Sequence, residues 1–257
     1  MLYNYFDFDI WDFMTTLLFA RHGQASFGQR NYDQLSELGA KQAACLGSQY
    51  AQAQRKIDAI VTGALSRQQD SATHFLSAYQ AGYPDAAQLQ PTLIEGFNEF
   101  NHTDVFVKYN PEFSTEVGLL TAIASAPVPK VRLAELFNEA MLRWHSGDHD
   151  EEYLESWPQF NQRVQQALQH VVELTQHKQA NTALIFTSGG VIAAITAHLL
   201  GQSSATAYSI NRSLINTGVT SVVVKSTPSD TPPKLRLLSL NEHSHLYQQG
   251  QDLLTWH

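Results

Sequence analysis

A histidine next to an arginine stands directly after the first apolar segment of the chain. Residues 16–20, Thr-Leu-Leu-Phe-Ala, predict a short buried strand, and Arg21-His22-Gly23-Gln24 follow it at once. A histidine ring nitrogen can attack phosphorus, and a guanidinium beside it can hold phosphoryl oxygens in a planar fork. The glycine would let the backbone approach a ligand closely. These residue types predict phosphoryl chemistry, provided that other segments supply the rest of a site.

A second arginine and two carboxylates offer further parts of such a site. Residues 57–61 predict another strand, and Arg67 lies near the start of the helix predicted after it, over 65–79. Glu99 follows in the segment Gly-Phe-Asn-Glu-Phe-Asn-His, and Glu95 stands four residues earlier. The carboxyl ends of neighbouring parallel strands meet at one edge of a sheet, so Arg67 and Arg21 are expected to lie close together.

A serine at the end of a later strand raises a separate question. Residues 183–192 read Ala-Leu-Ile-Phe-Thr-Ser-Gly-Gly-Val-Ile, an apolar strand that runs into a helix at Ser188-Gly189-Gly190. Helix N-termini bind anions, and serine is also a favoured N-cap, so Ser188 is expected to cap the helix, to bind an anion, or both. A serine-hydrolase nucleophile is disfavoured, because Phe186 stands where the nucleophile elbow requires glycine.

The order of the predicted elements indicates the fold class. Strands alternate with helices, which predicts a three-layer α/β domain with a mostly parallel sheet and helices on both faces. Between about residues 97 and 157 this alternation stops and prolines punctuate helical segments, which predicts a helical cap insertion. Residues 14–257 are expected to form one domain and residues 1–13 an N-terminal extension. The predicted strands are 16–20, 57–61, 88–94, 183–187, 220–224 and 234–240, and the predicted helices are 36–50, 65–79, 158–177 and 191–201.

Composition excludes several classes of function. The chain has 257 residues and a formal net charge of -8, which disfavours nucleic acids and anionic membranes as partners. Cys45 is the only cysteine, so no intramolecular disulfide can form, and a reducing cytoplasmic setting is expected. No apolar run is long enough to span a bilayer, and no signal peptide is recognised. The segment with His145, Asp148, His149 and Asp150 is expected to be an acidic solvated loop rather than a metal site.

Taken together, these segments resemble the histidine phosphatase superfamily, also called the phosphoglycerate mutase-like family. The resemblance covers about residues 16–246, nearly the whole chain. It rests on Arg21-His22-Gly23, Asp33, Leu35-Ser36-Glu37-Leu38-Gly39 and Gln42-Ala43, on Gly63, Arg67, Ser71 and Ala72, and on Glu155-Ser156, Asn216 and His245-Leu246.

The resemblance implies a fold and a reaction. The fold is the phosphoglycerate mutase-like one, and His22 would attack the substrate phosphorus and become a phosphohistidine. Arg21 and Arg67 would neutralise the phosphoryl oxygens, and Glu99 would protonate the leaving oxygen, with Glu95 as the second choice. The scheme requires no metal and no cofactor. The expected phosphate-binding residues are Arg21, Gly23, Gln24, Arg67, Ser188, Gly189 and Gly190.

The sequence departs from the family pattern at Ser188, which stands where the family carries a second histidine. A serine can donate one hydrogen bond but brings no positive charge, and loss of one preorganised donor typically costs about 100- to 1,000-fold in rate. His102 is an alternative substitute for the missing histidine, whereas His245 matches a histidine of the family's own pattern. Three functions therefore remain open: a metal-independent phosphatase for a small phosphomonoester, a weakened phosphate-ester-binding or regulatory protein, and a mutase-type isomerase. The expected partner is a small phosphorylated metabolite, and a homodimer is possible.

Overall fold

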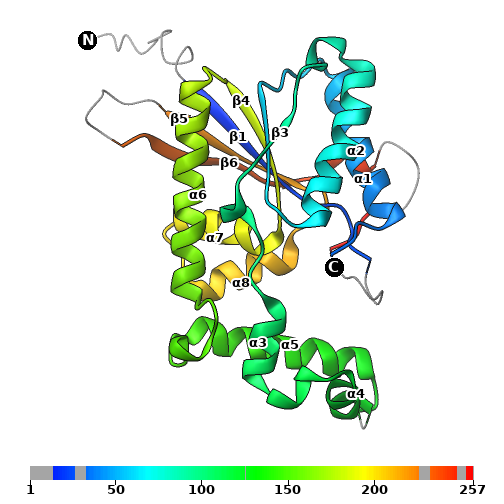
Figure 1. The fold of residues 1–257 in the computed structure, drawn as a ribbon, viewed down its shortest axis with the longest axis vertical. Coiled ribbons are helices and arrows are strands. Elements are labelled where there is room, and N and C mark those ends of the chain that lie inside the picture. Colours follow the sequence, from blue (N-terminus) through cyan, green and yellow to red (C-terminus); the bar gives the residue numbers. More distant parts are fainter. Residues whose placement is uncertain (1–13, 27–32, 125, 226–231, 248–252, 257) are drawn as a thin grey trace, which may run out of the picture.

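The computed structural model describes residues 14–26, 33–124, 126–225, 232–247 and 253–256 (Figure 1). The predicted N-terminal extension, residues 1–13, lies outside them. Within the described residues, six strands form one mixed sheet in the order β3-β2-β4-β1-β5-β6. Pairing is parallel among β3, β2, β4 and β1, and antiparallel between β1, β5 and β6. The strands are β1 (Met14–Arg21), β2 (Ala59–Thr62), β3 (Pro91–Leu93), β4 (Thr182–Thr187), β5 (Val219–Lys225) and β6 (Lys234–Glu242).

Helices cover both faces of this sheet and create a separate apolar core on each (Figure 1). Helices α1 (Glu37–Gln52) and α2 (Ser66–Gly82) pack against each other on one face. Helices α6 (Trp157–His177), α7 (Gly189–Leu199) and α8 (Ser204–Ser213) lie on the other side. Strands β1 and β4 are buried on both faces, which explains why their sequences are continuously apolar rather than alternating. The predicted three-layer architecture is confirmed.

A group of helices is inserted between η3 and α6 and forms one end of the molecule (Figure 1). This cap consists of α3 (His102–Tyr109), α4 (Glu116–Ala124) and α5 (Pro129–Ser146). The described residues also form short 3-10 helices: η2 (Pro84–Ala86), η3 (Glu95–Phe97), η4 (Pro111–Ser114), η5 (Asp150–Glu152) and η6 (Ser244–Leu246). The cap therefore falls within the predicted insertion, residues 97–157.

Local sequence chemistry explains where the elements begin. Ser36 caps α1 by accepting a hydrogen bond from the N–H of Gly39, and Ser156 forms a capping box at the start of α6. The predicted strand over 88–94 is shorter than expected, because only Pro91–Leu93 pair with β2. The sequence patterns do not predict helix α8, which is short and mostly polar. None of the described helices is both long and apolar enough to cross a lipid bilayer.

Trp144 of α5 anchors the cap to the sheet domain. Its side chain is fully buried, its ring lies 4.7 Å from that of Phe100 and 5.2 Å from that of Trp157 between centroids, and its Nε1–H donates to the carbonyl of Glu155 at 2.9 Å. Phe100 follows Glu99 directly. Packing of the cap and placement of this carboxylate are therefore coupled.

We predict that Trp144→Ala lowers the free energy of unfolding by about 3–5 kcal/mol, because it leaves a cavity and removes a hydrogen bond. Urea denaturation followed by circular dichroism measures this change. Leu154→Ala is the control, since Leu154 is 78% exposed and its truncation should change stability by less than about 0.5 kcal/mol. Equal losses for the two variants would contradict this account of the cap.

Candidate active site

His22 lies at the carboxyl end of β1, and two hydrogen bonds fix its tautomer. The side-chain Nδ1 lies 2.7 Å from the carbonyl oxygen of Gly23, to which it donates. The Nε–H of Arg67 donates to Nε2 at 3.1 Å, so Nε2 carries the lone pair. The residue is only 6% exposed. His22 is thus a neutral imidazole with its unprotonated nitrogen directed at a guanidinium, which is the form required of a nucleophile.

Arg67 is held in place by an acidic partner from the first loop. Its Nη1 lies 2.7 Å from Oδ1 of Asp33, while Oδ2 of the same carboxylate accepts from the N–H of Ser66 at 2.8 Å. The carboxylate therefore binds the arginine and the start of α2 together. Arg67 is buried, so this pair is screened less than a surface ion pair. Arg21 is held by the segment after α8, since its Nη1 donates to the carbonyl of Leu214.

Burial and the two cations together control the charge of His22. Removal from water lowers the pKa of His22 well below its usual value of 6.5, and the positive charges of Arg67 and then Arg21 lower it further. The hydrogen bond to Gly23 opposes this shift. The imidazole consequently stays neutral at neutral pH, under the influence of two positively charged groups.

Glu99 reaches the same group of charges from the turn after η3. Its carboxylate accepts from the N–H of Gly190 at 3.0 Å and from that of Phe100 at 3.3 Å. Burial raises the pKa of Glu99, although the Gly190 hydrogen bond and the charges of Arg67 and Arg21 oppose the rise. Glu95 is exposed on η3. The structure therefore brings Glu99, rather than Glu95, to the arginines, and its role as the acid stays a prediction.

Ser188 is the N-cap residue of α7 by position, but its side chain makes no capping hydrogen bond. The residue is completely buried, and its Oγ accepts from Nε2 of Gln68 at 2.8 Å. Only its backbone carbonyl serves the helix, by accepting from the N–H of Ile192. Of the two roles expected for this side chain, capping is therefore wrong. Its role in binding an anion stays a prediction.

Most backbone N–H groups of the expected phosphate-binding residues donate hydrogen bonds to side chains of the protein itself. The N–H of Gly23 donates to Oγ of Ser71 at 2.9 Å, that of Gln24 to Oε1 of Gln42 at 2.9 Å, and that of Gly190 to Glu99. Glycine is required at position 23 because a Cβ there would lie 2.3 Å from the carbonyl oxygen of Gly39. Close packing on α1 is sufficient reason for this glycine, and the ligand approach that the sequence suggested stays a prediction.

The two glycines at the start of α7 have a related role. A Cβ on Gly190 would lie 2.2 Å from Oε1 of Glu99, and one on Gly189 would lie 2.2 Å from Oδ1 of Asn211 and 3.5 Å from Nε of Arg21. Because neither position carries a Cβ, the side chains of Glu99 and Asn211 can approach the N-terminus of α7. In this structure Glu99 takes the place at the helix end that an anion was expected to occupy.

The main chain around His22 is clamped by buried amides that connect it to the C-terminal segment. Nδ2 of Asn216 donates to the carbonyl of His22 at 3.1 Å, and Oδ1 of Asn216 accepts from Oγ1 of Thr255 at 2.9 Å. Nε2 of Gln42 donates to Oγ1 of Thr255 at 2.8 Å and to the carbonyl of Leu253 at 2.7 Å. Gln42 and Asn216 were recognised as parts of a pattern, but no sequence signal pointed to Thr255.

His102 begins α3, three residues after Glu99. Burial lowers its pKa, and the charge of Arg67 lowers it further, which places this ring within the electrostatic reach of the site. His245 is elsewhere: its Nε2 lies 2.8 Å from Oγ1 of Thr217, and burial lowers its pKa to about 4. In the described part of the chain, no cluster of three or more histidine, cysteine, aspartate or glutamate side chains has the arrangement of a metal site.

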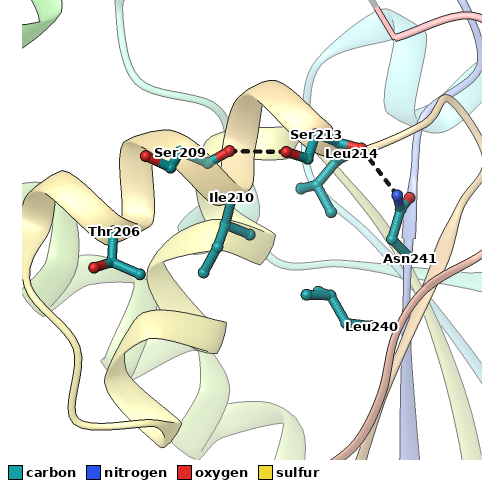
Figure 2. Close-up of a pocket in the computed structure, with 7 residues that line it drawn as sticks. All are labelled: Thr206, Ser209, Ile210, Ser213, Leu214, Leu240 and Asn241. Atoms are coloured by element: carbon teal, nitrogen blue, oxygen red, sulfur yellow. Dashed lines mark hydrogen bonds between the residues drawn. The ribbon is translucent and has the colours of Figure 1, made fainter.

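A hollow of about 240 Å³ lies between α8 and β6, outside this group of residues (Figure 2). The hydroxyl of Ser213, one of its lining residues, donates to the carbonyl of Ser209, and Nδ2 of Asn241 donates to the carbonyl of Ser213. The hydroxyl of Ser209 likewise donates to the carbonyl of Ala205. These polar groups are satisfied by the protein itself, so we assign the candidate site to the His22 region instead.

The site thus combines a buried neutral histidine, two arginines and a carboxyl group, which are residue types suited to phosphoryl transfer. The model of the histidine phosphatase superfamily, branch 1, matches residues 17–111 and 129–230. The chain belongs to this family. The expected resemblance is thereby confirmed at the level of the family and the fold.

Solved structures show the same fold. A phosphoglycerate mutase from Bacillus anthracis str. Sterne superposes with a TM-score of 0.61 and 15% identity, over 94% of this chain and 99% of that one. An alpha-ribazole phosphatase from Shigella flexneri gives 0.57 and 18%, over 89% and 97%. A mycobacterial glucosyl-3-phosphoglycerate phosphatase in complex with inorganic phosphate gives 0.56 and 21%, over 90% and 99%. No curated protein sequence matches the chain.

We predict that Arg67→Gln raises the pKa of His22, because a positive charge that opposes protonation of the ring is removed. The titration is followed by NMR of the His22 ring nitrogens. Arg132→Gln is the control, since Arg132 lies in the cap and pairs with Glu135 and Glu139. An unchanged or lower pKa in Arg67→Gln would contradict the proposed electrostatic control.

Proposed function

We propose that the chain is a phosphatase that hydrolyses a small phosphomonoester through a phosphohistidine at His22. The observation that carries the proposal is the Nδ1-protonated, neutral form of His22, whose Nε2 lone pair faces Arg67. An incoming phosphoryl group takes over the Nε–H of Arg67, which frees Nε2 for attack. Nothing in this scheme calls on a group from outside the chain other than the substrate and water.

The first chemical step forms a bond between Nε2 of His22 and phosphorus and breaks the bond to the leaving oxygen. Arg67 and Arg21 stabilise the charge that develops on the phosphoryl oxygens. Glu99 in its protonated form gives its proton to the leaving oxygen, for which its raised pKa makes it suitable. The product alcohol leaves and a phosphohistidine remains.

In the second step the carboxylate of Glu99 removes a proton from water. The water oxygen attacks phosphorus, and the bond from phosphorus to Nε2 breaks. Inorganic phosphate leaves, and both Glu99 and His22 return to their starting protonation states. The same carboxyl group thus serves as acid and then as base.

The cap favours a substrate with a single phosphate. Its two arginines are engaged with carboxylates: Arg132 pairs with Glu139 at 3.2 Å, and Arg143 pairs with Glu152 at 2.6 Å. A mutase that handles a doubly phosphorylated species needs cations for the second phosphate. The engagement of both arginines favours a hydrolase over an isomerase, with Lys108 in the last turn of α3 as a further cation of the cap.

Ser188 supports a second candidate, a phosphate-ester-binding protein with weak turnover. Its hydroxyl is neutral, fully buried and bound to Gln68, so it adds no charge to the pocket. If the family's second histidine position is Ser188, as the sequence indicates, the site relies on two arginines where relatives add an imidazole. A rate reduced by about 100- to 1,000-fold would follow.

Phosphate release from a panel of phosphomonoesters distinguishes these functions. We predict measurable release by the native chain and a loss of about 1,000-fold or more in His22→Ala, because no other group can form the covalent intermediate. Tight binding of the esters without release would instead indicate the weakened binding protein. Interconversion of phosphate isomers with little release would indicate a mutase.

We predict that kcat falls as the pH rises through the pKa of Glu99, because the proton needed by the leaving oxygen is lost. In Glu99→Gln this basic limb should disappear and kcat should fall by about 100- to 10,000-fold. The measurement is a pH profile of kcat with a substrate whose leaving group is basic. Glu95→Gln is the matched control and should retain the native profile, whereas a loss of the limb in that variant would assign the acid to Glu95.

A further inference from the structure

Gln68 is a fully buried polar residue that the proposed reaction does not use. It follows Arg67 on the first turn of α2, and it is 0% exposed, whereas its neighbour Gln69 is exposed. A buried carboxamide costs stability unless its hydrogen-bonding groups are satisfied. The partners of Gln68 therefore indicate why a polar side chain is accommodated there.

These partners belong to three different segments of the chain around the candidate site. Nε2 donates to Oγ of Ser188 at 2.8 Å, at the start of α7, and to the carbonyl of Phe97 at 3.0 Å, just before the turn that carries Glu99. Oε1 accepts from the N–H of Leu65 at 3.3 Å, in the turn that leads to Arg67. One carboxamide thus connects the segments that carry the arginine, the carboxylate and the serine.

The carboxamide is packed closely against two of its neighbours, Gly63 and Ser188. A Cβ on Gly63 would lie 2.1 Å from Oε1 of Gln68, and Ser188 is fully buried against its Nε2. Protein interiors are close-packed, so a larger side chain at position 188 has to displace Gln68. The pair Gln68–Ser188 consequently fills the volume that an imidazole at position 188 would need.

We propose that Gln68 is a positioning residue that sets Ser188 and the Glu99 turn relative to Arg67, and that its carboxamide occupies the space of a histidine side chain at position 188. This inference deepens the proposed phosphatase function and rests on it for the kinetic consequence alone. The spatial part concerns the folded chain and is independent of turnover.

The kinetic consequence follows from what each segment does. Gln68→Met retains much of the side-chain volume but loses both N–H donors. The carbonyl of Phe97 still accepts from Oγ1 of Thr187 at 2.7 Å, so the fold retains a hydrogen bond at this point. The segment that leads to Glu99 and the start of α7, however, both lose their hydrogen bonds to α2. Phosphate binding by Arg21 and Arg67 is affected less than proton transfer by Glu99.

The first experiment compares Gln68→Met with Gln69→Met, in which the exposed neighbour is changed. We expect kcat to fall by about tenfold in Gln68→Met with KM changed by less than about threefold, and neither to change in Gln69→Met. An unchanged kcat, or a loss that is entirely in KM, would overturn the positioning role.

A readout without turnover separates this inference from the proposed function. In the structure, the N–H of Gly190 lowers the pKa of Glu99, so loosening α7 from the turn should raise it. NMR of the Glu99 carboxyl carbon should show an upward shift of the pKa in Gln68→Met and none in Gln69→Met. If the native chain releases no phosphate but this shift is present, the proposed function fails and the positioning role stands. If the shift is absent, the positioning role fails whatever the activity.

The second experiment tests the shared volume by a double-mutant cycle in melting temperature. Ser188→His alone and Gln68→Ala alone should each lower Tm by about 3–10 °C, the first by overpacking and the second by leaving a cavity and unpaired groups. Combined, the two changes should restore Tm to within about 3 °C of the native value, because the imidazole fills the vacated space. Additive losses, or a native Tm for Ser188→His alone, would refute the shared volume.

Discussion

The hydrogen bond from Arg67 to His22 is the interaction on which the candidate site depends. It joins a permanent cation to a ring that must remain uncharged, and it does so where water is nearly excluded. Since a buried cation is costly, the arrangement requires a counter-charge, which Asp33 supplies. The cation therefore disfavours protonation of His22 and, in the proposed function, attracts the substrate anion. Without burial, neither effect would be large at physiological ionic strength.

The surrounding structure holds this pair rigidly through neutral groups. Asn216 and Gln42 bind the backbone of His22 and Gln24, and both are bound in turn by Thr255 near the C-terminus. Amides and hydroxyls satisfy buried backbone groups without adding charge that would disturb the pKa of His22. Chain segments separated by more than 200 residues thus meet near the backbone of His22.

Gln68 and Ser188 form another uncharged link, which joins α2 to the start of α7. The two arginines provide the positive charge of the candidate site, while the carboxylate of Glu99 accepts from the N–H of Gly190 at the start of α7. The helix terminus therefore stabilises a carboxylate of the protein itself in this structure. In the proposed function, a substrate anion would share this environment with Glu99, which would link anion binding to the protonation of that carboxyl group.

Much of the fold and part of the site followed from the sequence alone. Continuous apolar runs such as residues 16–20 and 183–187 determined the buried parallel strands, because burial on both faces removes any need for alternation. The prolines between 97 and 157 marked the cap, and Arg21, His22 and Arg67 were identifiable because strand ends converge at one edge of the sheet. Short-range patterns of this kind can be read without coordinates.

Tertiary structure alone decided which polar residues meet. Gln68 and Gln69 are indistinguishable in the sequence, yet the turn of α2 buries one against Ser188 and exposes the other. Glu99 and Glu95 differ in the same way, since a 3-10 turn directs only one of them at the arginines. The tautomer of His22 and the anchoring role of Thr255 depend on contacts across the whole chain. Such contacts are set by packing, and packing is a property of the folded chain that no local pattern of residues specifies.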